Sequence, residues 1–263
     1  MGSRAFDTHA HVWHGPLRLI EGARHRPTYD APVDEYIAHL DRHALDGGLL
    51  IQPSFLGTDN SLMLEAVRRY PHRLKAVAVV NPSIDAAALD ALAKDNVVGV
   101  RYNLIGLPLP DFASGPYPEF HRELARRHWH VELHRESSDL PRLLDTLLAQ
   151  GVRIAVDHFG RCYSPDDAGF RHLLGLGASG QVWVKVSGAY RCGGDEPGIA
   201  LAGRLLEAYG PDRLLWGSDW PHTQHESLVT YDSTYALFGR SIPDTAVRKR
   251  ILEEAPAALF GDT

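Results

Sequence analysis

Histidine is the residue type that stands out in this sequence, with 15 copies in 263 residues. Four histidines and one aspartate fall at the ends of segments that resemble β-strands: His9, His11, His134, His158 and Asp219. His9 and His11 are two positions apart, and residues i and i+2 of a strand point to the same face. We therefore expect these two imidazoles to project into one space.

A single histidine is more often a surface or hydrogen-bonded core residue than a functional one. Four imidazoles and a carboxylate that arrive from four separate strands are a different case, because converging titratable groups mark functional sites. Such a set can do acid–base chemistry on water, or it can hold a metal ion through imidazole nitrogens and a carboxylate.

The segments that must position these residues are short and apolar. Most are apolar on both faces, as in the run Leu49-Leu50-Ile51, which is typical of parallel strands buried on both sides. We predict strands at Phe6–Trp13, Gly48–Ser54, Lys75–Asn81, Val97–Leu104, His130–His134, Arg153–Phe159, Val182–Gly188 and Leu214–Asp219.

Amphipathic segments alternate with these strands. Asn60, Ser83 and Ser138 are suited to cap three of them, and Gly151 follows the end of the segment that Ser138 caps. The predicted helices are Asp34–Ala44, Ser61–Tyr70, Ile84–Lys94, Asp139–Gln150, Pro165–Leu174, Glu196–Tyr209, Ser227–Phe238 and Pro243–Glu254.

Strict alternation of strand and helix predicts an α/β fold, and eight repeats in a chain of this length predict a (β/α)8 TIM barrel. No sequence repeat, low-complexity segment or linker divides the chain, so we predict one domain, residues 1–263. The active site of such a barrel lies at the carboxyl ends of its strands, where the five candidate residues are found.

The composition is that of an ordinary globular protein, with 44% hydrophobic residues, 23% charged residues and a formal net charge of −6. No basic stripe and no long apolar run is present, so neither a nucleic acid nor a membrane is an expected partner. The start, MGSR, does not resemble a signal peptide, and Cys162 and Cys192 form no disulfide framework. We expect a cytoplasmic protein that acts on a small molecule.

Five segments carry a resemblance to a known family: FDTHAHV (residues 6–12), QPSFLGTDN (52–60), GVRYN (99–103), DHFGR (157–161) and GSDWPH (217–222). With histidines on strands one, five and six and an aspartate on strand eight, the chain resembles the amidohydrolase superfamily. More narrowly, it resembles the amidohydrolase-related group that contains 2-pyrone-4,6-dicarboxylate lactonase and related sugar and muconolactone lactonases. The first and last segments are the specific ones.

The resemblance implies a hydrolase that opens a small lactone, either acidic or polyhydroxylated. In the pyrone lactonase an aspartate on strand eight activates water without a metal, and histidines polarise the lactone carbonyl. Carried to this chain, the base is Asp219, and His9, His11 and His158 are the carbonyl and oxyanion partners. A carboxylate among imidazoles stays ionised and can take a proton from water, and N–H donors stabilise a developing alkoxide.

The resemblance also implies substrate-binding residues, because that group binds acidic substrates through arginines, whose fork suits a carboxylate. The matching positions are Arg101, Arg161, Arg191, Tyr29, Ser54 and His222. One departure concerns a further arginine of the pyrone lactonase, shortly after the strand-four one. This chain reads NLIGLP (residues 103–108) there. A second anion clamp is therefore missing, which argues against the dicarboxylate pyrone as substrate.

A second departure concerns metal binding. His134 stands where the pyrone lactonase has a tyrosine, and it restores the ligand set of mononuclear zinc members of the superfamily: His9, His11, His134 and Asp219. One Zn²⁺ per chain, with His158 as acid–base residue, and a metal-free site are both compatible with this sequence. No lysine ends strand four for carbamylation, so a two-metal site is not expected.

Two alternatives remain at this stage. One is a non-oxidative, zinc-dependent decarboxylase of the same superfamily, which the GSDWPH ending, the segment of residues 52–60 and the short chain disfavour. The other is a barrel retained only for binding or as a scaffold. Every candidate catalytic position holds a chemically competent residue, which argues for an enzyme, although fold alone never fixes function.

Overall fold

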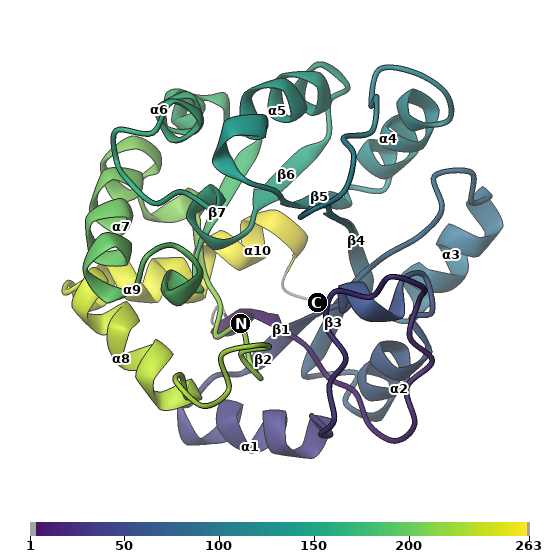
Figure 1. Ribbon diagram of the computed structural model, residues 1–263, viewed down its shortest axis with the longest axis horizontal. Coiled ribbons are helices and arrows are strands. Elements are labelled where there is room, and N and C mark those ends of the chain that lie inside the picture. Colours follow the sequence, from purple (N-terminus) through teal and green to yellow (C-terminus); the bar gives the residue numbers. More distant parts are fainter. Residues whose placement is uncertain (1–3, 262–263) are drawn as a thin grey trace.

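The computed structural model describes residues 4–261 and confirms the predicted (β/α)8 barrel. Eight parallel strands follow one another around the sheet in chain order, and the helices form a ring outside them (Figure 1). The strands are β1 (Phe6–Ala10), β2 (Gly47–Ile51), β3 (Leu74–Ala78), β4 (Val97–Asn103), β5 (His130–His134), β6 (Arg153–Val156), β7 (Val182–Val186) and β8 (Leu214–Trp216).

Each connection between strands contains a helix that covers the sheet, and two helices follow α8 at the end of the chain (Figure 1). The helices are α1 (Val33–Arg42), α2 (Ser61–Arg69), α3 (Ala86–Lys94), α4 (Tyr117–Arg126), α5 (Leu140–Ala149), α6 (Ala168–Gly175), α7 (Asp195–Tyr209), α8 (Tyr231–Ser241), α9 (Thr245–Leu252) and α10 (Glu254–Phe260). Within residues 4–261, none of them has the length and apolar character needed to cross a membrane.

The predicted elements differ from the observed ones in three ways. Most predicted strands run too far at their carboxyl ends, because the chain turns there: His158 and Asp219 have left-handed backbone angles, with φ of 48° and 59°. Helices α4 and α10 are not among the predicted helices. The expected caps are confirmed only in part. Asn60 is the N-cap residue of α2, but its side chain bonds the backbone of Val79 instead of its own helix. Asp85 rather than Ser83 caps α3, and Asp139 rather than Ser138 precedes α5.

The barrel closes where β1 meets the segment after β8. The backbone N–H of Asp219 donates to the carbonyl of His9 at 2.8 Å, and the N–H of His11 donates to the carbonyl of Trp220 at 2.8 Å. The buried carboxylate of Asp7 supports the same seam by accepting from the backbone N–H and the hydroxyl of Ser218, at 2.9 and 2.6 Å. Barrel closure therefore brings His9, His11 and Asp219 side by side.

The amino-terminal end of the barrel is filled by apolar side chains. Phe6, Leu49, Val77 and Trp183 form one buried cluster with Leu259 of α10. Figure 1 shows α10 lying across the ring of strands, where it closes this end. The opposite end, where the strands finish, holds the polar residues, as in other barrels of this kind.

The seam between β1 and β8 generates a stability prediction. A Cβ added at Gly217 would lie 2.5 Å from the Cβ of His9 and 2.9 Å from its backbone nitrogen, so Gly217→Ala must push the two segments apart. We expect a loss of about 1–3 kcal/mol in the free energy of unfolding, measured by urea denaturation.

The matched control is Gly203→Ala in the middle of α7, where nothing lies within 4 Å of the added carbon. Alanine favours a helix over glycine by about 1 kcal/mol, so this variant should be as stable as the wild type or more so. Equal stability of the two variants would mean that the seam is not tightly packed.

Candidate active site

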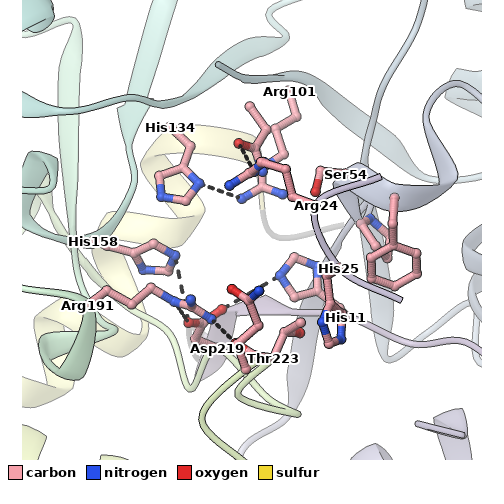
Figure 2. Close-up of a pocket in the computed structure, with 14 residues that line it drawn as sticks. His11, Arg24, His25, Ser54, Arg101, His134, His158, Arg191, Asp219 and Thr223 are labelled. Atoms are coloured by element: carbon pink, nitrogen blue, oxygen red, sulfur yellow. Dashed lines mark hydrogen bonds and ion pairs between the residues drawn. The ribbon is translucent and has the colours of Figure 1, made fainter. Parts of the chain in front are cut away.

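A pocket opens at the carboxyl ends of the strands, and it gathers side chains from most of the barrel (Figure 2). Four of the five predicted chemical residues line it, namely His11, His134, His158 and Asp219. His9 is completely buried just below them, with its ring 5.0 Å from that of His11 and 4.7 Å from that of His158. The structure therefore brings the whole predicted cluster together.

Asp219 is the central carboxylate of the pocket and is held from one side. Its Oδ2 accepts from the hydroxyl of Tyr190 at 2.6 Å and from Nε of Arg191 at 2.7 Å. Burial raises the pKa of Asp219, but the guanidinium charge of Arg191 favours the ionised form, and this pKa lies well below its usual range. Asp219 is thus ionised at neutral pH, with Oδ1 directed toward the histidines.

His11 presents a lone pair to Asp219. Its Nδ1 lies 2.7 Å from the carbonyl oxygen of Ile51, which can only accept, so Nδ1 carries the proton. Burial lowers the pKa of His11, so the ring is neutral and Nε2 has no proton. This nitrogen is 3.6 Å from Asp219 Oδ1. Two acceptors therefore face each other across a space that suits a group with protons or positive charge.

His158 lies on the other side of the carboxylate, in a short 3₁₀ turn (His158–Gly160) directly after β6. Its Nδ1 is 2.9 Å from the hydroxyl of Ser187, and its Nε2 is 3.8 Å from Asp219 Oδ2. Burial lowers the pKa of His158 to about 4, so the ring is neutral at neutral pH. Because the serine hydroxyl can donate or accept, His158 can carry its proton on either nitrogen.

His134 points into the pocket from β5, beside Arg101 and His158. Its ring lies 5.0 Å from that of His158, and its Nδ1 is 3.5 Å from Nη2 of Arg101. An arginine only donates, so Nδ1 accepts and Nε2 keeps the proton. Within residues 4–261, Nε2 has no hydrogen-bond partner. His134 therefore offers an N–H group to whatever fills the pocket.

Two groups of side chains bring three ligand atoms within 4.8 Å of one another and could hold a metal ion by distance alone. They are His9, His11 and Asp219, and His9, Asp157 and His158. His134, the fourth ligand expected from the sequence, belongs to neither group.

The substrate-binding residues expected from the sequence are divided by the structure. Arg101, Arg191 and Ser54 line the pocket. Tyr29 donates to Glu226 at 2.5 Å outside it, and His222 lines a neighbouring pocket beside Trp220. Arg161 is not among the lining residues, and its buried Nε has no hydrogen-bond partner in the described part of the chain.

The structure also shows that two of these arginines are already paired. Arg101 is buried and donates to Asp157 at 3.0 Å, and Arg191 holds Asp219. Arg24 reaches the pocket from the loop after β1 and was missed by the sequence reasoning. Its Nη2 donates to Oδ1 of Asn103 at 3.1 Å, so a loop residue far away in sequence supplies an additional cation (Figure 2).

At the floor of the pocket and beneath it, buried charged side chains form one cluster: Arg101, Glu132, Asp157 and Lys185. Lys185 Nζ is 2.5 Å from Glu132 Oε2, and Arg101 pairs with Asp157. Burial and the neighbouring Asp157 raise the pKa of Glu132, while the charges of Lys185 and Arg101 oppose that rise and favour the ionised form. The sequence did carry a signal for this cluster, since a charged residue interrupts the apolar strands VWVKV and HVELH.

Comparison with known proteins gives a consistent set of relatives. The family described as "Amidohydrolase" matches residues 6–261. The 4-sulfomuconolactone hydrolase of Rhizobium radiobacter is 31% identical over 273 residues, which cover 98% of this chain and 90% of that protein. A crystal structure of a probable 2-pyrone-4,6-dicarboxylic acid hydrolase from Acinetobacter baumannii, with citric acid bound, has a TM-score of 0.94 at 39% identity and covers 98% of this chain and 99% of that one.

A 2,6-dihydroxybenzoate decarboxylase from Rhizobium is more distant. It has a TM-score of 0.69 at 16% identity, with 98% of both chains covered. This likeness shows a common fold alone.

Proposed function

We propose that this chain, which belongs to the amidohydrolase family, hydrolyses a small lactone that carries an anionic group. Two relatives support this reaction: one is named as a muconolactone hydrolase, and the other as a probable hydrolase of a pyrone dicarboxylic acid. The observation in this chain that carries the proposal is the pair of acceptors formed by His11 Nε2 and Asp219 Oδ1, 3.6 Å apart.

This pair of acceptors is suited to hold the attacking water. A water molecule between them donates one proton to His11 Nε2 and the other to Asp219 Oδ1, which leaves an oxygen lone pair free for attack. When the water oxygen bonds to the lactone carbonyl carbon, its proton passes to Asp219. His11 thus acts as an acceptor that orients the water, a different role from the oxyanion donor expected from the sequence.

The imidazole N–H groups that lie above the buried charges can donate hydrogen bonds to the carbonyl oxygen of the lactone. As the carbon becomes tetrahedral, negative charge develops on this oxygen, and preorganised donors in a site that excludes water stabilise it. We assign this role to Nε2 of His9, with Nε2 of His134 as a further donor to the substrate. In this position His134 does what a tyrosine hydroxyl would do, because both donate a single proton.

Collapse of the tetrahedral intermediate completes the reaction. Asp219 passes the proton that it took from water to Nε2 of His158, which lies 3.8 Å from Asp219 Oδ2, while Nδ1–H of His158 donates to the hydroxyl of Ser187. The bond between the carbonyl carbon and the ring oxygen breaks, and the leaving alkoxide takes this proton from Nε2, so His158 returns to its neutral form. Lactone and water thus give a hydroxy acid, and Asp219 returns to its ionised form.

The distances between the possible ligand atoms would suit a zinc ion, but the positions of the protons on the imidazoles would not. A ligand nitrogen must offer a lone pair. His11 does so, but Nδ1 of His9 lies 3.1 Å from the ammonium group of Lys185 and accepts from it, which leaves the proton of His9 on the nitrogen that faces Asp219. His134 lies outside the ligand group. We therefore assign water activation to Asp219 alone.

The cations at the pocket indicate an anionic substrate. Arg24 and Arg191 line it. Arg191 is paired with Asp219, whereas Arg24 donates to the neutral amide of Asn103. Asn103 begins the segment in which the pyrone lactonase has a further arginine. Arg24, presented by Asn103, can therefore replace that arginine and bind a carboxylate at the mouth of the pocket.

The first functional prediction concerns Asp219. Replacing Asp219 with asparagine keeps its size but removes the base, so we expect kcat for a carboxylated lactone to fall by about a hundredfold or more. Acid release at constant pH measures hydrolysis, and a parallel assay for CO₂ detects decarboxylation.

Asp145→Asn is the matched control, since Asp145 lies on the outer surface of α5 and pairs with His172. It should leave kcat unchanged. A folded Asp219→Asn protein with wild-type kcat, or release of CO₂ without hydrolysis, would refute the proposed reaction.

The second functional prediction concerns Arg24. Arg24→Met should raise KM for a carboxylated lactone by about tenfold, because a charge-assisted hydrogen bond is lost, and should leave kcat nearly unchanged. The methyl ester of the same lactone should show little change in KM. Arg26→Met, an exposed residue of the same loop outside the pocket lining, is the control. Equal effects of Arg24→Met on the acid and its ester would assign Arg24 a structural role instead.

A further inference from the structure

Lys185 is a fully buried lysine on β7, directly next to His9 inside the barrel. Its Nζ lies 2.5 Å from Glu132 Oε2, 2.8 Å from the carbonyl oxygen of Thr8 and 3.1 Å from Nδ1 of His9. An ammonium group has three donors and no acceptor. These three partners therefore account for all three of its protons.

The position of the His9 proton follows from this contact. Asp157 Oδ1 and Glu132 Oε1 also lie near Nδ1, at 3.3 and 3.4 Å, but both are farther from it than Lys185 Nζ, at 3.1 Å. Burial, reinforced by Lys185, keeps the pKa of His9 well below its usual range, so the ring carries a single proton. Since Nδ1 accepts from Lys185, this proton is on Nε2, 3.7 Å from Asp219 Oδ1.

We propose that Lys185 is a positioning residue that fixes the Nε2–H tautomer of His9 and so makes His9 a hydrogen-bond donor to the substrate rather than a metal ligand. The catalytic consequence of this tautomer rests on the proposed lactone hydrolysis. The tautomer itself can be measured in the protein without substrate, so failure of the tautomer proposal can be distinguished from failure of the proposed hydrolysis.

A lysine that only neutralised buried carboxylates would not need to face the imidazole. Charge balance and hydrogen bonding can be separated by paired substitutions, because Lys185 and Glu132 form one ion pair. Lys185→Met removes the donor and leaves Glu132 without its partner, which is costly in a buried site. The double variant Lys185→Met/Glu132→Gln removes the donor and restores the balance of charge, and Glu132→Gln alone keeps the donor.

The tautomer is measured by ¹⁵N NMR of histidine-labelled protein, in which protonated and unprotonated ring nitrogens have separate shifts. His9→Gln assigns the signals of His9. We expect the proton on Nε2 in the wild type and in Glu132→Gln. In the double variant it should move to Nδ1, where Asp157 Oδ1 can accept it.

Two further readouts follow from the moved proton. In the double variant, kcat for the carboxylated lactone should fall by about a hundredfold, as when one oxyanion donor is lost, while KM changes little. Nε2 of His9 would then be a free lone pair beside His11 and Asp219, so Zn²⁺ alone, titrated calorimetrically, should bind at least about tenfold more tightly than to the wild type.

The proposal is overturned if wild-type His9 carries its proton on Nδ1. It is also overturned if the double variant regains both the wild-type tautomer and wild-type kcat, because Lys185 would then serve only as a counterion. Should Lys185→Met fail to fold, the wild type and the charge-balanced double variant still decide between these outcomes.

Discussion

Four buried charges inside one barrel must neutralise one another, and the arrangement of the site depends on that requirement. Lys185 faces Glu132, and Arg101 faces Asp157, with no water-exposed surface to soften the cost of an unpaired charge. Strands β4, β5 and β7 and the turn after β6 each supply one member. The relative positions of these strands are therefore constrained directly beneath the pocket.

The two cations of this cluster also determine what the imidazoles above them can do. Lysine and arginine only donate, so the nitrogens of His9 and His134 that face them must accept. The other nitrogen of His134 then enters the pocket as an N–H group, and that of His9 faces Asp219 from below as an N–H group. The carbonyl of Ile51 has the opposite effect on His11, whose nitrogen enters as a lone pair beside Asp219. Three similar side chains are thus divided into two donors and one acceptor by their partners outside the pocket.

The sequence predicted the barrel and the cluster of His9, His11, His134, His158 and Asp219, because alternation along strands and the place of strand ends follow from local patterns. It did not predict the turns at His158 and Asp219, where left-handed backbone angles end the strands early. The pairing of Lys185 with Glu132 joins residues 53 positions apart, and Arg24 meets Asn103 across 79. Such contacts depend on how the barrel closes and on the path of the loops. The proton positions that set the role of each histidine depend on these contacts, so they could not be predicted from local sequence patterns either.

Water activation by Asp219 without a metal has a clear test in protein that has been stripped of zinc by prolonged dialysis against a chelator, with the residual metal measured by elemental analysis. We expect the stripped protein to hydrolyse a carboxylated lactone at the full rate, and added Zn²⁺ to leave kcat unchanged. Activity that is lost in proportion to the zinc removed, and that returns when one equivalent per chain is added back, would contradict this mechanism and make His9 a metal ligand.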